Sequence, residues 1–225
     1  MSLVTWKDLV VDAADAAASA EFWAERLGLR LEALDGDDAV LRGDDAGQTI
    51  WFNAVPEPKT VKNRVHLDVW DGSLDPFADL ERLSEPGEFS WTTFRDPEGN
   101  EFCVFDREGA APTFKALEVD AVDHLAISTW WADVLGGRLT HHDGHAYSSI
   151  EDVPGCPGEG FDFAQVPEPK TVKNRVHWDV RLNLGATVRN LQDRGARVLR
   201  SPLADEPWTV MADPEGNEFC VFDPA

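Results

Sequence analysis

The sequence predicts an α+β protein made of two tandem copies of one domain, because two long segments each occur twice. Val55–Val69 reads VPEPKTVKNRVHLDV and Val166–Val180 reads VPEPKTVKNRVHWDV, so they differ at a single position. Asp96–Asp106 and Asp213–Asp223 both read DPEGNEFCVFD. The segments recur in the same order at a spacing far longer than a solenoid repeat, which indicates a duplicated domain.

The boundary between the copies is predicted at Arg107–Thr113, a short stretch that contains Gly109 and Pro112. Copy 1 then spans residues 1–108, and copy 2 spans residues 113–225. Because so short a linker holds its neighbours close, we expect the two copies to pack on each other.

Each copy is predicted to begin with a strand and a helix. In copy 1, Leu9–Val11 is a short apolar strand, and Asp12 follows as the N-cap of the helix. Gly28 ends that helix, and Asp120 and Gly136 play the same parts in copy 2. The apolar face of the helix is formed by Ala16, Ala20, Trp23 and Leu27 in copy 1 and by Ile127, Trp131 and Leu135 in copy 2.

The clearest strand pattern lies in the repeated motif. Val65–Val69 alternates, with apolar residues on one face and His66 and Asp68 on the other. Copy 2 repeats the alternation with His177 and Asp179. The sequence therefore predicts one polar strand face in each copy.

Shorter elements complete each copy. Thr49–Val55 is a further strand, and second helices are predicted at Pro76–Leu83 and Leu184–Arg194. Turns are indicated at Asp35-Gly36, Asp143-Gly144 and the two DPEGN segments. The run His141-His142-Asp143-Gly144-His145 is expected to form a solvent-exposed turn and not a metal site, because copy 1 has no histidine there.

The composition is that of a strongly acidic globular protein, with a net charge of −22 and a pI of about 4.4. Such a field repels nucleic acids and anionic membranes, so we expect neither as a partner. The apolar runs are too short to span a bilayer, and no signal-like stretch opens the chain. The three cysteines, Cys103, Cys156 and Cys220, form no CxxC pair, which favours reduced thiols and a cytoplasmic location.

The order of these elements, with the VPEPKTVKNRVHLDV and DPEGNEFCVFD motifs, resembles the glyoxalase/bleomycin-resistance/dioxygenase (vicinal oxygen chelate) superfamily. More narrowly, the motifs resemble its glyoxalase-like domain subfamily, and the resemblance covers nearly the whole chain, twice. It implies that each copy holds two βαβββ modules, whose curled mixed sheets form a cup around a ligand or metal. It also implies a monomer in which the copies pair about a pseudo-twofold axis, or a homodimer.

The resemblance implies positions for metal ligands as well. The first module supplies a His or Gln on its first strand and a Glu on its last. The second module supplies a His on its first strand and a Glu on the strand after the DPEGN turn. Here His66 and His177 match the second-module histidine, but the final Glu is replaced by Cys103 and Cys220. The remaining positions fall on aromatic segments: near Trp6 and on Trp51-Phe52 in copy 1, near Phe114 and on Phe161–Phe163 in copy 2.

A lone imidazole and thiol do not generally hold a catalytic divalent ion, so we predict no metal and no other cofactor. The missing Glu also serves the glyoxalases as their proton-transfer base. Asp68 and Asp179 lie on the same strand face as the histidines, which leaves a zinc site made of His, Asp and Cys as the alternative.

Ten side chains are predicted to bind a small-molecule ligand in the cups. They are His66, Asp68, Cys103, Trp51 and Arg64 in copy 1, and His177, Asp179, Cys220, Phe163 and Arg175 in copy 2. We favour polar contacts from the two histidines, oriented by the aspartates, over strand histidines that only satisfy a neighbouring carboxylate.

Structural roles stay open for the other candidates. Cys103 and Cys220 are typical of small buried hydrophobes. Arg64 and Arg175 belong to loops rich in Lys and Arg, which either bind an anion or satisfy contacts between the copies, and we favour the second. The aromatic side chains are as typical of a core as of an apolar pocket.

Three functions follow from these observations. The first is a glyoxalase-like protein that binds, isomerises or lyses a small organic molecule without the usual metal. The second is a non-catalytic protein of the bleomycin-resistance kind, which sequesters a cationic drug in an acidic cleft. The third is a metal-dependent lyase or dioxygenase, against which the missing ligands argue.

Overall fold

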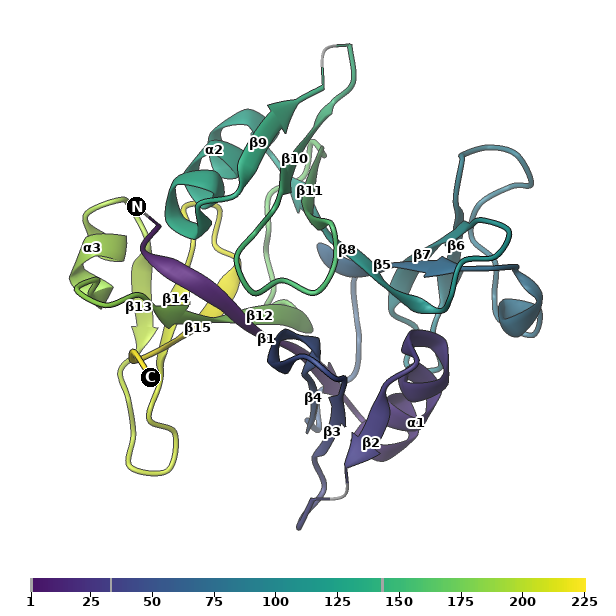
Figure 1. Ribbon diagram of the computed structural model, residues 1–225, viewed down its shortest axis with the longest axis horizontal. Helices are drawn as coiled ribbons and strands as arrows, with labels where there is room; N and C mark the ends of the chain where they lie inside the picture. The colour runs from purple at the N-terminus through teal and green to yellow at the C-terminus, as the bar shows by residue number, and fades with distance from the viewer. Residues whose placement is uncertain (1, 33, 143) are drawn as a thin grey trace.

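The computed structural model describes residues 2–32, 34–142 and 144–225, which form two mixed β-sheets with helices packed against them (Figure 1). The elements of copy 1 are β1 (Val4–Ala13), α1 (Ala16–Leu27), β2 (Arg30–Glu32), β3 (Ala39–Arg42), η1 (Ala46–Gln48), β4 (Ile50–Ala54), β5 (Val65–Asp71), η2 (Asp75–Phe77), β6 (Thr92–Arg95) and β7 (Glu101–Asp106). The elements of copy 2 are β8 (Thr113–Ala121), α2 (His124–Leu135), β9 (Arg138–His141), β10 (Tyr147–Glu151), β11 (Gly160–Gln165), β12 (Val176–Leu182), α3 (Val188–Gln192), β13 (Arg197–Arg200), β14 (Thr209–Ala212) and β15 (Glu218–Phe222).

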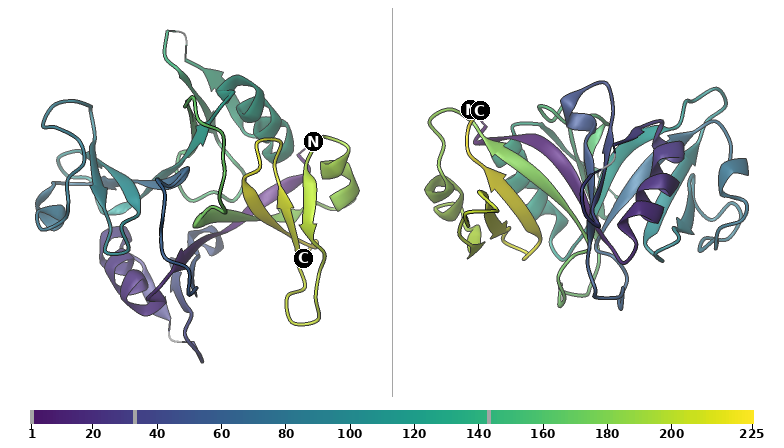
Figure 2. Two further views of the ribbon diagram at one scale, coloured as in Figure 1. Left: turned by 180° about the vertical axis from the view of Figure 1, so that it is seen from behind. Right: turned by 90° about the horizontal axis from the view of Figure 1, so that it is seen from below.

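Each sheet combines one module from each copy. The eight-stranded sheet has the order β13-β14-β15-β12-β1-β4-β3-β2, and the seven-stranded sheet has the order β6-β7-β5-β8-β11-β10-β9. We expected one cup within each copy. The structure instead builds each sheet across the two copies, and Figure 2 shows the two sheets splayed apart.

The exchange rests on the two central strands of each sheet. β1 pairs antiparallel with β12, and β8 pairs antiparallel with β5. The short segment 107–112 lets the chain turn from β7 into β8, which lies on the other side of β5. Both edges of each central strand are therefore hydrogen-bonded, whereas a separate module would leave one edge unpaired.

Each copy nevertheless packs its own core between modules that belong to different sheets. In copy 2, the ring of Trp131 on α2 lies 4.9 Å from that of Trp178 on β12 and 6.5 Å from that of Phe161 on β11. In copy 1, Trp23 on α1 lies 5.0 Å from Phe102 on β7. The predicted helix faces are buried here. Trp6 of copy 1 joins the two sets of rings, because its ring lies 5.7 Å from that of Phe161 in copy 2 and the buried cluster is continuous between the copies.

The helix starts differ from the prediction. Asp15 and Asp123 cap α1 and α2, and their side chains accept from the backbone N–H of Ala18 and Ala126. Asp12 and Asp120 lie in β1 and β8, which are longer than expected because parallel pairing with β4 and β11 extends their C-terminal ends. Gly28 and Gly136 end the helices with φ of 63° and 80°, as predicted.

The second helices are shorter than predicted. Copy 2 forms only α3, and the helix predicted at Pro76–Leu83 is wrong, because only the single turn η2 forms there. Arg82 makes a β-bridge to Phe94, and the backbone N–H of Leu83 donates to the carbonyl of Thr93. Strand pairing with β6 therefore replaces the helix. No helix among the described residues is long and apolar enough to cross a membrane.

The repeated DPEGN segments form tight turns, as predicted. In copy 1 the backbone N–H of Asp96 donates to the carbonyl of Asn100, and Gly99 has a φ of 81°. In copy 2 Asp213 and Asn217 make the same bond. Asp143, part of a predicted hairpin turn, lies outside the described residues.

Candidate functional site

The structure brings the predicted polar residues of each copy together in a compact group. We call His66, Asp68 and Cys103 the site-1 trio and His177, Asp179 and Cys220 the site-2 trio. In each trio one nitrogen, one carboxylate oxygen and one sulfur lie within 4.8 Å of one another. The alternation of β5 and β12 turns His and Asp to the face opposite the core.

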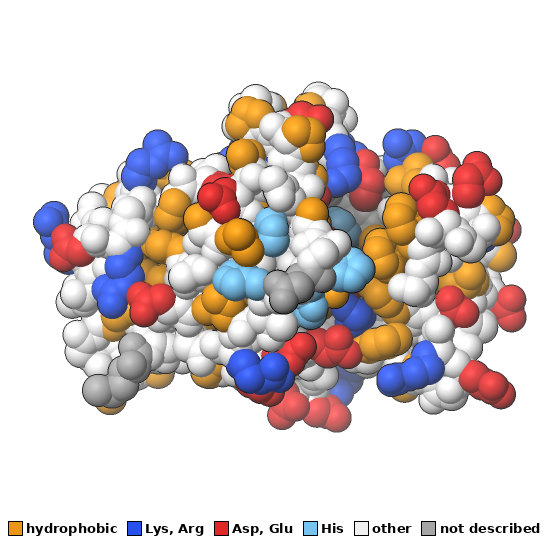
Figure 3. All heavy atoms as spheres, turned by 90° about the horizontal axis from the view of Figure 1, so that it is seen from above, with side chains coloured by type: hydrophobic (Ala, Val, Ile, Leu, Met, Phe, Trp, Pro, Cys, Tyr) orange, Lys and Arg blue, Asp and Glu red, His pale blue; other side chains and the backbone are white. Residues whose placement is uncertain are grey.

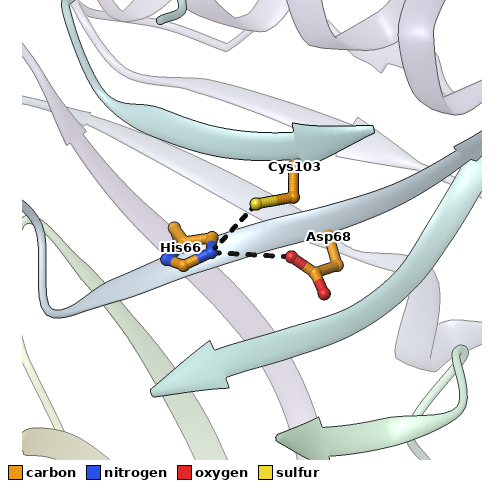
Figure 4. A group of neighbouring side chains, drawn as sticks. All are labelled: His66, Asp68 and Cys103. Atoms are coloured by element: carbon orange, nitrogen blue, oxygen red, sulfur yellow. Dashed lines mark hydrogen bonds and ion pairs between the residues drawn. The ribbon is translucent and has the colours of Figure 1, made fainter. Parts of the chain in front are cut away.

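In site 1, His66 and Asp68 come from β5, and Cys103 comes from the neighbouring strand β7 (Figure 4). The Nε2 atom of His66 lies 3.5 Å from the Sγ atom of Cys103 and 3.6 Å from the Oδ1 atom of Asp68. Parallel pairing of Asp68 with Cys103 sets this arrangement. The three side chains point toward one another (Figure 4).

Site 2 repeats the geometry on β12 and β15. The Nε2 atom of His177 lies 3.7 Å from the Sγ atom of Cys220 and 3.9 Å from the Oδ1 atom of Asp179. Asp179 pairs with Cys220 in the same parallel register. The second trio is therefore a slightly looser copy of the first.

Burial controls the charge state of both trios. Removal from water lowers the pKa of His66 to about 3 and that of His177 to about 4, so both imidazoles are neutral near pH 7. Burial raises the pKa of Asp68 and of Asp179 to about 7. It also raises the pKa of both thiols well above the usual range, so neither trio holds a free thiolate.

A lysine from the other copy lies beside each trio, and neither lysine was predicted from the sequence. In site 1 the ammonium of Lys115 lies 3.6 Å from Asp68 and 3.4 Å from Asp162. In site 2 the ammonium of Lys7 pairs with the neighbouring carboxylate of Asp8 and lies 4.0 Å from Asp179. Lys7 and Lys115 occupy equivalent places in β1 and β8. An alignment of the two copies could therefore have identified these lysines from the sequence.

The surroundings of the two trios differ in polarity. Glu118, opposite His66, and Asp162, opposite Glu118, flank site 1. The oxygens of Asp68, Glu118 and Asp162 lie within 4.8 Å of one another. Burial raises the pKa of Glu118 well above its usual value, and the nearby charges of Asp68 and Asp162 raise it further. The equivalent positions in site 2 are Val10 and Trp51.

Glu118 and Asp162 also correct the predicted first-module positions. The rings of Trp6 and Phe114 lie in the core and do not reach either trio. On β8 the side chain beside His66 is Glu118, and on β11 it is Asp162 that alternates away from the buried aromatics. The predicted first-strand positions near Trp6 and Phe114 are therefore replaced by Val10 and Glu118, whereas the predicted last-strand segments Trp51-Phe52 and Phe161–Phe163 contain Trp51 and Asp162.

The donor chemistry of each trio fits a divalent ion of the zinc class. Zinc binds nitrogen and oxygen at about 2.0–2.1 Å and sulfur at about 2.3 Å, so tetrahedral ligand atoms lie roughly 3.3–3.5 Å apart. The distances in site 1 are close to these values. The Oδ1 atoms of Asp68 and Asp179 are buried and have no hydrogen-bond partner among the described residues. A buried carboxylate oxygen without a partner is costly, so these oxygens are placed to accept a ligand.

The predicted aromatic contacts divide between site and core. Trp51 lies in site 2, where its Nε1 atom donates to the Oδ2 atom of Asp8 at 3.2 Å. Phe163 does not line a site: it is fully buried and its ring lies 6.2 Å from that of Phe161, on the core side of β11. The alternation of β11 places Asp162, and not Phe163, beside site 1.

Arg64 and Arg175 connect the two copies and do not reach either trio's donor atoms. Arg64 donates to the backbone carbonyl of Glu168 at 2.6 Å, and Arg175 donates to that of Glu57 at 2.7 Å. Arg175 also lies 3.4 Å from the carboxylate of Glu98. Both arginines therefore make contacts between the PEPKT loops, and their binding of a ligand stays a prediction.

Histidine side chains gather over the β9–β10 hairpin, as Figure 3 shows. His141 and His124 both contact the Oγ atom of Ser148 at 2.8 Å, and His142 contacts Ser149 at 2.9 Å. These serine contacts account for the ring nitrogens involved. No group of three metal-ligand atoms forms there among the described residues.

The fold and paired sites define a class of protein with two modules in each half and a site between halves. Three modules have the order βαβββ, and the fourth has the strands β5, β6 and β7 with the single turn η2 in place of a helix. The glyoxalase-like domain model matches residues 8–105 and 116–222. The chain therefore belongs to the glyoxalase-like domain family.

Solved structures support the fold. A mutant of glyoxalase I from Zea mays is 14% identical, with a TM-score of 0.69 over 98% of this chain and 92% of that one. The cppA protein from Streptococcus pneumoniae TIGR4 is 12% identical, with a TM-score of 0.53 over 98% of each chain. A comparison with curated proteins finds no significant match.

Proposed function

We propose that the chain is a metal-dependent glyoxalase-like enzyme that acts on a small oxygenated organic molecule at site 1. One observation carries the proposal: a neutral imidazole, a thiol and a partnerless buried carboxylate oxygen converge at distances suited to one ion. This proposal differs from the sequence-based prediction of no metal. That prediction assumed that aromatic residues occupy the first-module ligand positions and leave each site short of ligands.

His66, Asp68 and Cys103 would hold the ion and leave a position for the ligand. A bound ion of this class polarises a carbonyl or hydroxyl oxygen of the ligand. The thiol of Cys103 would have to lose its proton when the ion binds, so uptake would release protons.

Glu118 is the residue that we assign to proton transfer. It is half-buried and lies opposite His66, and burial with the nearby charges of Asp68 and Asp162 raises its pKa, which makes the carboxylate a stronger base than an ordinary Glu. Lys115 and Asp162 would hold the local charge balance beside it. Together these residues suit removal of a proton from carbon next to a polarised carbonyl.

Site 2 supports a lesser role. Val10 stands where site 1 has Glu118, so site 2 has the trio without that base. We assign it metal-assisted ligand binding without proton transfer. The cytoplasm, with its reduced thiols, is the compartment in which both trios would keep their cysteines.

Metal analysis of the purified chain is the first test. We expect two zinc-class ions per chain by mass spectrometry of the elements, one per site, and an unchanged content in the control variant Cys156→Ser. Absence of any stoichiometric ion, with no thermal stabilisation by zinc, nickel, cobalt or manganese, would contradict the proposal.

The second test measures proton exchange. Small hydroxy- and oxo-carbonyl compounds in deuterated water should lose the signal of the proton next to the carbonyl in proton NMR. Glu118→Gln should slow this exchange by about 10²–10⁴-fold while both ions stay bound. An equal rate in Glu118→Gln would remove Glu118 from the reaction.

Sequestration of a cationic molecule is the second candidate, because the carboxylates of Asp68, Glu118, Glu159 and Asp162 gather around Lys115. Thermal stabilisation by a cationic drug in protein that binds no metal would favour it over the enzyme.

A further inference from the structure

The lysines beside the trios sit at two equivalent irregularities of the central strands. The register of β1 with β12 shifts between Trp6 and Asp8, and Lys7 is the residue left out of the pairing. The register of β8 with β5 shifts so that Lys115 is left out in the same way. A bulge of this kind re-aims one side chain without ending the strand, and here it turns a lysine toward the trio.

Each ammonium contacts the oxygen of the aspartate that faces away from the trio. Lys115 Nζ lies 3.6 Å from Oδ2 of Asp68, while Oδ1 faces His66. Lys7 Nζ lies 4.0 Å from Oδ2 of Asp179, while Oδ1 faces His177. The two oxygens of each carboxylate therefore have different partners, a cation on one side and the trio on the other.

Aromatic rings hold both lysines in place. The ammonium of Lys115 lies 4.3 Å from the ring centre of Phe105, and that of Lys7 lies 4.0 Å from the ring centre of Phe222. These are cation–π distances, and the phenylalanines stand at equivalent places in β7 and β15. Lys115 is 7% exposed, which leaves it little freedom to turn away.

This arrangement survived where its surroundings changed. The residues around the two lysines differ between β1 and β8, with Trp6 and Asp8 in one and Phe114 and Ala116 in the other. The lysine, its bulge, its aromatic contact and its aspartate are the same in both. A purely local ion pair would not require all four to recur.

We propose that Lys115 and Lys7 are positioning residues, each supplied by one copy to the trio of the other. Each lysine holds one carboxylate oxygen so that the second is presented to the ion, as hydrogen-bonded neighbours commonly do for metal ligands. Each site is then complete only when both copies are present. The inference rests on the proposed function, because it assigns the carboxylate a ligand role.

The test measures zinc affinity by competition with a chelator, one site at a time. Full-length chains carrying His177→Ala retain site 1, and those carrying His66→Ala retain site 2. We expect Lys115→Met to weaken site 1 by about 10–100-fold and leave site 2 unchanged. Lys7→Met should do the reverse. Arg107→Met is the control, since that cation lies over Trp70 and not at a trio.

Two further measurements separate positioning from folding. Lys115→Arg keeps the charge and should recover most of the zinc affinity. With cobalt in place of zinc, Lys115→Met should keep the sulfur-to-metal absorption from Cys103 but change the visible bands, because the carboxylate ligand is lost. Thermal unfolding shows whether Lys115→Met folds. If Lys115→Met fails to fold, Lys115→Gln replaces it in the affinity measurement.

The outcomes separate the two proposals. Unchanged zinc affinity in both lysine variants, with two ions bound by the unmodified chain, overturns the positioning role and keeps the proposed function. Equal weakening of both sites by either variant also overturns it. An unmodified chain that binds no ion overturns both.

Discussion

Sites 1 and 2 carry the same trio and the same type of lysine, but their neighbours differ in kind. Glu118 and Asp162 make site 1 acidic, whereas Val10 and Trp51 make site 2 apolar at the equivalent positions. The trio lies on strands whose sequences stayed nearly identical, and the neighbours lie on strands that diverged. The comparison teaches that duplication preserved the donor set while the surrounding surface became free to change.

The largest expected effect concerns the core behind site 2. Trp178 is fully buried and packs on Trp131, whereas its smaller counterpart Leu67 is 4% exposed. Trp178→Ala should lower the free energy of unfolding by about 3–5 kcal/mol, and Leu67→Ala by about 2–3 kcal/mol. Urea unfolding monitored by circular dichroism measures both. A larger loss of unfolding free energy for Leu67→Ala than for Trp178→Ala would contradict the prediction that the larger buried side chain contributes more.

Removal of a trio histidine should separate the sites most clearly. His66→Ala is expected to lower zinc affinity at site 1 by more than about 100-fold, because loss of a direct ligand costs more than loss of a residue that only contacts a ligand. His177→Ala should do the same at site 2 only. Elemental analysis should then find one ion per chain in each variant and none in the double variant. Two ions in either single variant would contradict the assignment.

The burial of Asp68 in site 1 predicts a pH dependence in metal-free protein. The pKa of Asp68 is about 7 in the folded chain, against 3.8 for an ordinary Asp, so the folded state binds its proton more tightly. The stability from this group is complete below about pH 3.8 and is lost as pH rises through 7.

Asp68→Asn removes the loss of stability that accompanies ionisation of Asp68 above about pH 7. The metal-free variant should gain stability over the unmodified chain at about pH 8 by on the order of 1–2 kcal/mol, with little gain at about pH 4. Urea unfolding at both pH values in the presence of EDTA measures the difference. Asp179→Asn is the comparison and should gain a similar amount, because burial raises the pKa of Asp179 to about 7 as well and the like charge of Asp8 lies opposite it.

The smallest expected effect comes from the flanking residues themselves. Asp162→Asn should weaken zinc binding at site 1 by roughly threefold to tenfold, because one nearby negative charge is lost. Trp51→Phe removes the hydrogen bond to Asp8 but no charge, so site 2 should change less than about twofold. Chelator competition in single-site backgrounds resolves both. Equal effects would mean that the charge around site 1 has no bearing on its ion.

Local patterns predicted several parts of this molecule correctly. The alternation of Val65–Val69 placed His66 and Asp68 on one face, and the repeat placed an identical pair on β12. Gly28 and Gly136 marked helix ends because a left-handed residue closes a helix within one turn. These features depend on residues near one another in the chain.

Other parts lay beyond local patterns. The helix caps were placed three residues early, at Asp12 and not Asp15, because pairing with β4 lengthens β1. Phe163 was assigned to a ligand and lies in the core, since the face of β11 depends on its register with β8. Lys115 was missed because its direction depends on a bulge, which appears only when β8 pairs with β5.

The sequence by itself determined that the chain holds two copies, which residues alternate on their strands, and that His, Asp and Cys recur together. Only the tertiary structure decided that each site combines residues of both copies. Side-chain periodicity is a property of one strand, but the choice of neighbouring strand depends on which unpaired edges meet when two cores pack. That choice put Lys115, Glu118 and Asp162 beside His66 and gave site 2 a different surface around the same trio.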